Sequence, residues 1–221
     1  MSVSLQGEIT NNVVELNLQA AATNIGTSTV LYDSTNNGEI INQIQGDIPN
    51  YSYGSSPYYF STVRGLVIGT SCTSIGSYSF AYLESFSPTL PLGSLTIPDS
   101  VTSIGDYAFS SNYFTGSLTI GNNVTSIGNG SFSVCYNFTQ LIIPSSNVTS
   151  IGENAFGSDT GLTAAYINCP ASSWVGSNAL LGTSSLTNIY VHADYVGGYT
   201  NNWQGSTATL NTWTNYPTPA P

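Results

Sequence analysis

Few side chains in this sequence of 221 residues could carry out acid–base, nucleophilic or metal chemistry. Its single imidazole, His192, lacks a positioned Ser, Cys or carboxylate partner, and a general base needs such a partner to act. The three Cys form neither a Cys-x-x-Cys pair nor a Cys/His cluster, so we expect buried structural residues rather than a zinc site or disulfides; they are Cys72, Cys135 and Cys169. We therefore predict that the chain is not an enzyme, and we assign no catalytic residue, no metal ligand and no cofactor.

Asp106 and Glu153 form the one carboxylate pair whose spacing is relevant to catalysis, because they lie at equivalent places two copies apart in an internal repeat. Two stacked coils at about 4.8 Å each would separate them by about 10 Å, near the upper end of the range for an inverting glycosidase. Asn129 occupies the copy between them, and their exposed turn positions favour solvated side chains instead. A carbohydrate-active enzyme is therefore a remote alternative.

The charge balance excludes two classes of partner. The chain has one Arg, Arg64, no Lys and 11 acidic residues, and its formal net charge is -10. A phosphate-binding surface needs clustered Lys and Arg, so we predict no nucleic-acid partner and no attachment to an anionic membrane. No apolar run reaches the length of a membrane span, and the first residues lack the basic and apolar regions of a secretory signal. We predict no membrane insertion, and a non-classical route if the protein acts outside a cell.

An internal repeat organises the middle of the chain. The string Val101-Thr-Ser-Ile-Gly-Asp-Tyr-Ala-Phe109 recurs at 124–132 and 148–156, and degenerate copies lie at 72–80 and 172–180. A coil of about 23 residues cannot bury its own apolar face, whereas stacked coils share one continuous core. The first step of the repeat is longer than the others, which indicates an exposed loop near 81–93.

A short stretch of alternating apolar residues accompanies the repeat, and this alternation predicts a β-strand whose first and third residues face inward. The stretches are 66–68, 95–97, 118–120, 141–143, 165–167 and 189–191. Stacking predicts three apolar columns: Ile75, Ile104, Ile127, Ile151 and Val175; Phe80, Phe109, Phe132, Phe156 and Leu180; and Phe138, Leu162 and Leu186, with Phe114 one register out. The Gly after each Ile or Val of the first column should take a positive φ or let backbones approach closely.

The pattern LTIPDSVTSIGDYAF, together with Cys135 and Phe138 spaced three and six residues after Phe132, resembles the BspA-like (TpLRR) leucine-rich repeat family of surface proteins. The resemblance covers about residues 63 to 195. The segment from Ile189 to Tyr199, followed by Trp203, is also similar to the closing segment of that family. The resemblance implies a leucine-rich-repeat solenoid and a role in adhesion or recognition, and it carries no catalytic residues.

We therefore expect a mainly β fold, a leucine-rich-repeat solenoid of about five coils of 23 to 24 residues with a β-rich N-terminal cap or anchor segment. Residues 1–62 form that cap or attachment segment, with strands suggested at 3–9 and 13–18 and a turn at 36–38. Residues 63–195 form the solenoid, and 196–221 form a C-terminal cap and a Pro-rich tail. Whether 1–62 caps the solenoid or attaches it to a particle stays open.

The middle residue of each solenoid strand should face outward and offer a binding surface. Tyr with Asn, Gln and Ser is typical of adaptable recognition surfaces and of stacking on sugar rings. A solvated sheet face, or one covered by a neighbouring subunit, is the structural alternative. The candidate ligand-binding residues are Thr119, Ile142, Tyr166, Tyr190, Gln140 and Asn188.

Three functions follow as hypotheses. The first is a virion protein, a phage decoration, fibre or tail component on the virion surface, that contacts other virion or surface proteins through 1–62. The second is a bacterial or protist cell-surface adhesin or effector, extracellular by a non-classical route, that binds a glycan or protein receptor. The third is the carbohydrate-active enzyme. A homo-oligomer is compatible with the first two.

Overall fold

The structure is a computed structural model that describes residues 29–33, 39–44, 48, 65–82, 93–200 and 203–213, with side chains described for 48, 66–82, 93–200 and 203–213. Several expectations fall outside the described residues. They are the strands at 3–9 and 13–18, the turn at 36–38, Arg64, most of the loop at 81–93 and the Pro-rich tail at 215–221.

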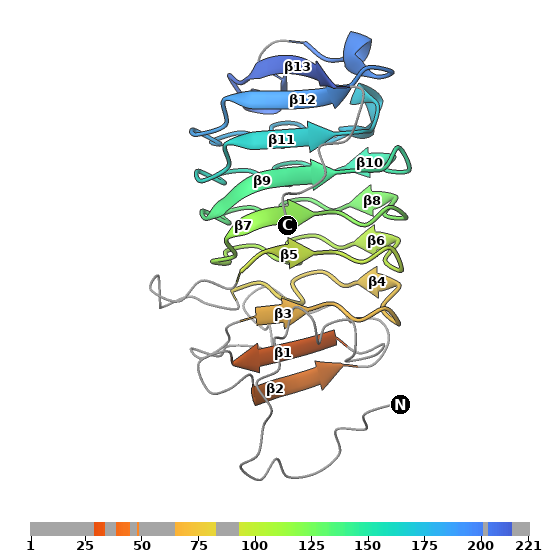
Figure 1. The fold of residues 1–221 in the computed structure, drawn as a ribbon, viewed down its shortest axis with the longest axis vertical. Coiled ribbons are helices and arrows are strands. Elements are labelled where there is room, and N and C mark those ends of the chain that lie inside the picture. Colours follow the sequence, from red (N-terminus) through yellow and green to blue (C-terminus); the bar gives the residue numbers. More distant parts are fainter. Residues whose placement is uncertain are drawn as a thin grey trace.

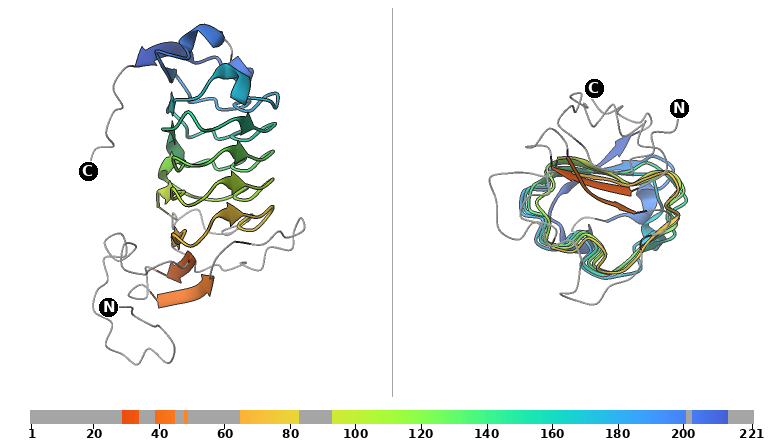
Figure 2. Two further views of the ribbon diagram at one scale, coloured as in Figure 1. Left: turned by 90° about the vertical axis from the view of Figure 1, so that its right-hand side faces the viewer. Right: turned by 90° about the horizontal axis from the view of Figure 1, so that it is seen from below.

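Short strands and three 3-10 turns, with no α-helix, make up the described part of the chain. They wind into coils stacked along one axis (Figure 1), and the coils superpose into a single outline when seen along that axis (Figure 2). The strands are β1 (Thr29–Asp33), β2 (Glu39–Ile44), β3 (Gly65–Val67), β4 (Ser74–Ile75), β5 (Leu95–Thr96), β6 (Ser103–Ile104), β7 (Gly116–Thr119), β8 (Ser126–Ile127), β9 (Phe138–Ile143), β10 (Ser150–Ile151), β11 (Ala164–Ile167), β12 (Asn188–His192) and β13 (Thr209–Trp213), and the turns are η1 (Ala171–Ser173), η2 (Val196–Gly198) and η3 (Trp203–Gly205).

Six strands form a parallel sheet in the order β13-β12-β11-β9-β7-β5. Its register places like residues over like, so that Leu118 aligns with Leu95 in one neighbouring strand and with Leu141 in the other. All three side chains are buried, and the residue after each of them faces away from the core. The alternation of inward and outward side chains that the sequence predicted is thus confirmed in this sheet.

A second parallel sheet has the order β10-β8-β6-β4 and consists of the Ser-Ile pairs of the repeat. The return segments that carry Phe are also bonded from coil to coil, because the Phe109 amide donates to the Ser131 carbonyl at 2.7 Å and the Phe132 amide to the Ala155 carbonyl at 2.8 Å. Main-chain hydrogen bonds along the stack therefore continue well beyond the two sheets.

An antiparallel arrangement meets the solenoid at its N-terminal side. Strand β1 pairs with β2 and with β3, in the sheet order β2-β1-β3. Ile48 forms an isolated parallel bridge to Ile75, and its buried side chain joins the core. The Ile48 amide donates to the Ser74 carbonyl at 3.0 Å, so Ile48 extends the column of Ile residues by one position.

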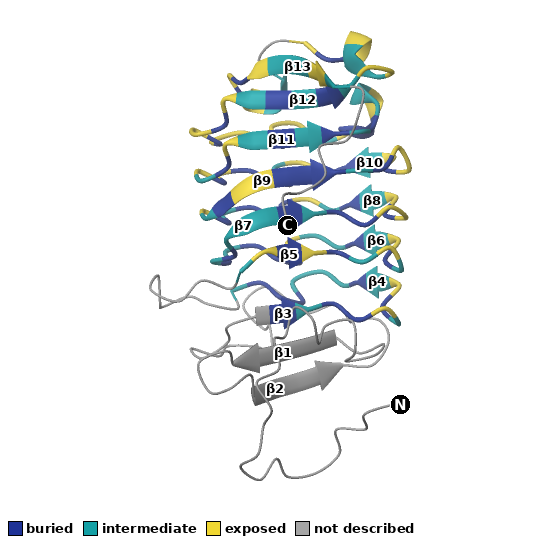
Figure 3. Cartoon of the chain, viewed as in Figure 1, coloured by how far each residue is buried: buried dark blue, intermediate teal, exposed yellow. Residues whose placement is uncertain are grey.

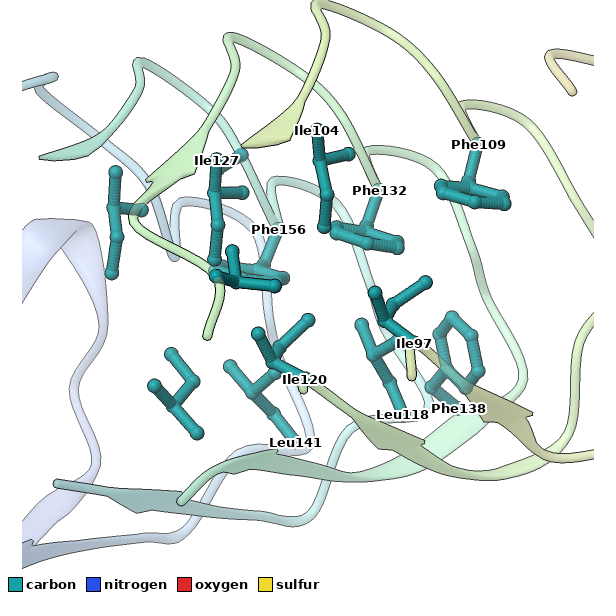
Figure 4. Close-up of a cluster of buried hydrophobic side chains, with 14 of the residues drawn as sticks. Ile97, Ile104, Phe109, Leu118, Ile120, Ile127, Phe132, Phe138, Leu141 and Phe156 are labelled. Atoms are coloured by element: carbon teal, nitrogen blue, oxygen red, sulfur yellow. The ribbon is translucent and has the colours of Figure 1, made fainter. Parts of the chain in front are cut away.

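The core consists of columns of similar apolar side chains (Figure 4). Rings of Phe80, Phe109, Phe132 and Phe156 stack in sequence, with centroids 5.3, 5.1 and 5.6 Å apart. Each stacked pair contributes about 0.5–1.5 kcal/mol beyond the burial of its area. The second predicted column is therefore confirmed, including Leu180, which is fully buried. Figure 3 shows the buried and exposed residues along the stack.

The third column is confirmed with a change of register. Phe114 stacks on Phe138 with centroids 5.6 Å apart and planes 6° apart, so its ring lies within the column rather than outside it. The pairing of β7 with β9 shifts between Gly116 and Ser117. In the main-chain register Phe138 aligns with Gly116, so the ring of Phe114 reaches the column from two residues before the aligned position.

Val175 was expected to end the Ile column, and this expectation is wrong. Its side chain is 66% exposed, whereas the neighbouring Trp174 is 5% exposed and packs against Phe156 with ring centroids 6.2 Å apart. The turn η1 immediately precedes Trp174 and replaces the Ser-Ile strand of the earlier coils. The larger indole therefore closes the end of the core.

The repeated Gly residues act through close approach and not through a positive φ. A Cβ on Gly105, Gly128 or Gly152 would lie 2.5 to 2.6 Å from main-chain atoms of the preceding coil. None of the three is among the residues of positive φ. The left-handed conformation occurs two residues after each Gly, in a column formed by Tyr78, Tyr107, Gly130, Asn154 and Asn178.

Gln204 covers the last coil at the C-terminal end. Its main-chain carbonyl accepts the Leu180 amide at 3.0 Å, and its side-chain oxygen accepts the Ala179 amide at 3.2 Å. Beneath it, the Trp174 indole donates to the Tyr199 hydroxyl, which donates to the Cys169 carbonyl, both at 2.9 Å. The two contacts of Gln204 satisfy the amides of Ala179 and Leu180, which would otherwise need a further coil as their partner.

Candidate binding surface

The outward face of the six-stranded sheet aligns the middle residues of successive strands. We call Thr96, Thr119, Ile142, Tyr166 and Tyr190 the outward stripe. The register pairs Thr119 with Ile142, Ile142 with Tyr166, and Tyr166 with Tyr190. Four of the six candidate residues therefore lie side by side in one line that crosses four strands. Val67, which the sequence aligned with them, lies in β3, and β3 pairs with β1.

Tyr166 and Tyr190 stack on each other at the C-terminal half of the stripe. Their ring centroids lie 4.9 Å apart and their planes differ by 7°. Both side chains are half-buried. Because the rings stack along the solenoid axis, their facing sides are occupied, and the pair presents ring edges and hydroxyl groups to a ligand. This geometry favours hydrogen bonding and edge contacts over a sugar ring laid between the two faces.

Ile142 occupies the stripe but is only 4% exposed. It is not among the residues of the apolar core. In the register it lies between Thr119 and Tyr166, so the stripe contains a buried apolar side chain at this position. The sequence pattern predicted an accessible side chain at this place, whereas the structure buries it.

Gln140 and Asn188 lie beside the stripe, because each is two residues before a member of it in the same strand: Ile142 in β9 and Tyr190 in β12. Gln140 is exposed and Asn188 is half-buried. The Asn188 side chain is already engaged, since its amide donates to Thr187 Oγ1 at 3.0 Å and its oxygen accepts the Asn211 amide at 3.1 Å. Gln140 is thus the freer of the two amides.

Sequence reasoning missed Asn211, which continues the stripe in β13. The register aligns Asn211 with Tyr190 and Leu210 with Ile189. The alternation of Leu210 and Thr212 around Asn211 could have indicated this strand, but the segment lacks the strings of the repeat. The stripe therefore extends one strand further toward the C-terminus than the sequence indicated.

The outward face carries neither carboxylates nor Lys or Arg. Its described residues in β5, β7, β9, β11, β12 and β13 are Ser, Thr, Gln, Ile, Ala, Tyr and Asn, with His192 and Trp213 at the carboxyl ends of β12 and β13. A partner that binds here would thus meet hydroxyls, amides and aromatic edges rather than ionic groups.

His192 has a carboxylate neighbour that sequence reasoning did not identify. Its Nδ1 lies 3.3 Å from Asp194 Oδ2, and its ring meets Trp213 edge-on with centroids 5.0 Å apart. The two side chains of the pair are 24% and 76% exposed, respectively. The described contacts of His192 include no Ser or Cys nucleophile, and a carboxylate that is largely solvated orients an imidazole only weakly.

Asp106 and Glu153 belong to a column that joins coils. Asp106 Oδ1 accepts the Asn129 amide at 2.7 Å, and Asn129 Oδ1 accepts the Glu153 amide at 2.8 Å. Asn129 thus bonds to both neighbouring coils, through its main-chain amide to Asp106 and through its side-chain oxygen to Glu153. The arrangement uses the Asp106 carboxylate to satisfy a main-chain donor, and it gives no separate support for a pair of catalytic acids.

The three Cys are free and buried, as the sequence predicted. Burial raises the pKa of the Cys169 thiol to about 11, and burial together with Asp159 raises the pKa of Cys135. Both side chains are therefore thiols at neutral pH rather than reactive thiolates. Within the described residues no group of three His, Cys, Asp or Glu could hold a metal ion, and no helix has the length and apolar character to cross a membrane.

Comparison with known protein families identifies the type of repeat that forms these coils. A model of the BspA type leucine-rich repeat region matches residues 82–203 in six copies, which is more than half of the chain. The chain belongs to the BspA-type leucine-rich repeat family. The expected resemblance is thereby confirmed, although we identified five copies and this match counts six. Membership of this family of surface proteins indicates a role in protein interaction or adhesion.

Among the solved structures that resemble this BspA-type chain are two leucine-rich repeat or antigen structures, and no curated protein matches the chain. The pneumococcal vaccine antigen PcpA is 13% identical, with a TM-score of 0.45 over 67% of this chain and 39% of PcpA. A leucine-rich repeat protein from Bacteroides ovatus is 17% identical, with a TM-score of 0.34 over 66% of this chain and 47% of its own. The chain spans less than half the length of either protein.

Proposed function

We propose that this BspA-type chain is a non-enzymatic display protein that binds a partner through the outward stripe. The observation that carries the proposal is the uncharged outward face, on which Tyr166 and Tyr190 are stacked and fixed in register by a parallel sheet. Rigid aromatic groups lose little conformational entropy on binding, and flanking amides and hydroxyls supply adaptable hydrogen bonds. The partner is a protein or a glycan rich in hydrogen-bonding groups.

In its specific form, the proposal is that the chain is a decoration, fibre or tail component of a virion. Two features support this form: a net charge of -10 with one Arg and no Lys, which leaves trypsin a single cleavage site, and a stack of coils suited to projecting from a particle. Residues 1–62 would then contact the particle. Mass spectrometry of purified virus particles tests this form, and absence of the chain from the particles contradicts it.

The second candidate is a cell-surface adhesin or effector of a bacterium or protist. The same outward stripe supports it, because a stripe of Tyr, Thr and Asn suits a glycan or protein receptor as well as a virion protein. Detection of the chain on intact cells, and not in virus particles, would favour this candidate. Binding of the purified chain on a glycan array would identify a receptor class.

The double variant Tyr166→Ala/Tyr190→Ala tests the stripe itself. We expect loss of at least tenfold in affinity for any ligand found, because aromatic anchors at the centre of an interface commonly contribute about 2 kcal/mol or more. Unchanged affinity would remove the stripe from consideration.

A second stacked pair supplies the matched control. Tyr78 and Tyr107 stack with centroids 5.0 Å apart, outside the six-stranded sheet. Both have positive φ, and Asn154 and Asn178 occupy the same column. The double variant Tyr78→Asn/Tyr107→Asn should therefore fold and bind as the parent chain does.

A further inference from the structure

A column of buried polar side chains follows the Phe column, three residues further along each coil. We call Asn112, Cys135, Asp159 and Thr183 the polar column. Their side chains are 1%, 0%, 2% and 5% exposed, respectively. Each lies in a return segment where coils meet, so each must satisfy its hydrogen-bonding groups within the protein.

Three members of the polar column donate a hydrogen bond to the main-chain carbonyl of a residue in the Phe column. Asn112 Nδ2 donates to the Phe80 and Phe109 carbonyls at 2.8 and 2.7 Å. Cys135 Sγ donates to the Phe109 carbonyl at 3.2 Å, and Thr183 Oγ1 donates to the Leu180 carbonyl at 2.7 Å. Donation is thus the common role of this position.

Asp159 differs because an ionised carboxylate has no proton to donate. Its Oδ1 accepts the Cys135 amide at 2.7 Å. The carbonyls that correspond to those bonded by Asn112 are those of Phe132 and Phe156, and neither accepts a hydrogen bond from any described residue. A carboxylate at this place would be buried at the position from which the other members of the polar column donate to such carbonyls.

The surroundings of Asp159 oppose its ionisation. Burial raises the pKa of this carboxyl well above its usual value, and the amide of Cys135 offsets part of that effect. The titratable side chain that interacts with Asp159 is the thiol of Cys135 in the preceding coil, and burial, followed by Asp159, raises the pKa of that thiol as well. Thr183, at the same position in the following coil, brings no charge. No cation is described that would stabilise a carboxylate at this place.

We propose that Asp159 is held as a neutral carboxylic acid in the folded stack and donates its proton to the Phe132 or Phe156 carbonyl. In this state Asp159 fills the role that Asn112, Cys135 and Thr183 fill in their coils. Loss of the proton leaves a buried charge and a carbonyl without a donor at the joint between two coils. The joint is therefore a pH-sensitive lock that is tightest in acid.

The direction of the pH effect follows from proton binding. The folded chain retains a proton on Asp159 at pH values where the unfolded chain has released it, so the folded state binds more protons. Stability is highest below the unfolded pKa of Asp, about 3.9, and falls as pH rises toward the raised folded pKa. One such group changes the folding equilibrium constant by up to tenfold for each pH unit in this window.

Urea unfolding of the 221-residue chain between pH 4 and pH 8 tests the lock. We expect the stability of the parent chain to fall with pH, and Asp159→Asn to remove most of that fall, because Asn donates as Asn112 does. Asp106→Asn is the matched control, since it also removes one negative charge but keeps an oxygen that accepts the Asn129 amide. This control should keep the pH dependence of the parent.

Two results would overturn the proposal: a parent chain whose stability is constant or rises over this pH range, or an Asp159→Asn variant that keeps the parent's dependence. If Asp159→Asn does not fold, Asp159→Thr replaces it, because Thr183 serves the same position. An independent measurement is the infrared band of a protonated carboxyl at pH 7. The band should be present in the parent and in Asp106→Asn, and its presence in Asp159→Asn would contradict the assignment.

Discussion

At the scale of single residues, the coils depend on positions that force the backbone into the left-handed region. One such column lies two residues after the Phe column and consists of Tyr82, Ser111, Val134, Ser158 and Gly182. Val134 has φ 65°, and a β-branched side chain is strained there because its Cβ crowds the neighbouring carbonyl. Gly182 shows that the same place accepts a residue without that strain.

Val134→Asn should therefore stabilise the protein. Asn tolerates the left-handed conformation, so we expect the free energy of unfolding to rise by about 1 kcal/mol, within the range of the strain relieved. Urea unfolding measures the change. Ser158→Asn is the comparison variant, since Ser158 has a similar φ of 63° without a branched Cβ, and its gain should be smaller. A destabilised Val134→Asn would mean that the packing of the Val side chain outweighs the strain of its backbone.

At the scale of elements, the spacing between neighbouring coils decides which residues the Ser-Ile-Gly segment accepts. A Cβ on Gly128 would lie 2.6 Å from the Asp106 nitrogen and the Gly105 carbonyl carbon, which are main-chain atoms held in the stack. The sequence left a positive φ and a close approach of backbones as alternatives for this Gly, and the structure shows close approach. Strands β6 and β8 would have to move apart to admit a side chain.

Gly128→Ala should consequently destabilise the protein by about 1–3 kcal/mol or more, as overpacking commonly does. Gly197→Ala adds the same methyl group at η2, where no atom lies within 4 Å of the new Cβ, and it should leave stability almost unchanged. Thermal or urea unfolding of both variants measures the difference. Equal effects of the two substitutions would contradict the assignment of close packing to Gly128.

At the scale of the whole molecule, cohesion comes from apolar columns and main-chain hydrogen bonds rather than from ion pairs. Among the described residues the one close contact between a basic and an acidic side chain is His192 with Asp194, and the Asp194 side chain is 76% exposed. The net charge of -10 is therefore mainly repulsive. The dependence of stability on salt concentration should reveal this repulsion, because salt screens the repulsion between exposed like charges.

Adding sodium chloride from about 10 mM to about 0.5 M should raise the unfolding midpoint or leave it unchanged at pH 7, since the Debye length falls over this range from about 30 Å to a few Å. Potassium chloride at equal ionic strength is the control for a specific effect of sodium. A midpoint that falls steadily with either salt would indicate stabilising ion pairs and would contradict this account.

The features that every coil repeats could be predicted from the sequence. The period, the alternation of Leu118 and Ile120 and the recurrence of Phe109, Phe132 and Phe156 were sufficient to predict the strands, the stacked rings and the line of the outward stripe. The physical reason is that a residue repeated at one period must pack against its own copies. Such contacts can be inferred from the spacing without knowledge of the rest of the chain.

The tertiary structure alone decided what happens where neighbouring coils differ. It exposed Val175 and buried Trp174 at the end of the core, and it buried Ile142 on the outward face. It also placed Asp159 in a column whose other members donate hydrogen bonds. These outcomes depend on the residue above and below each position and on the closure of the last coil, and the period carries no information about either.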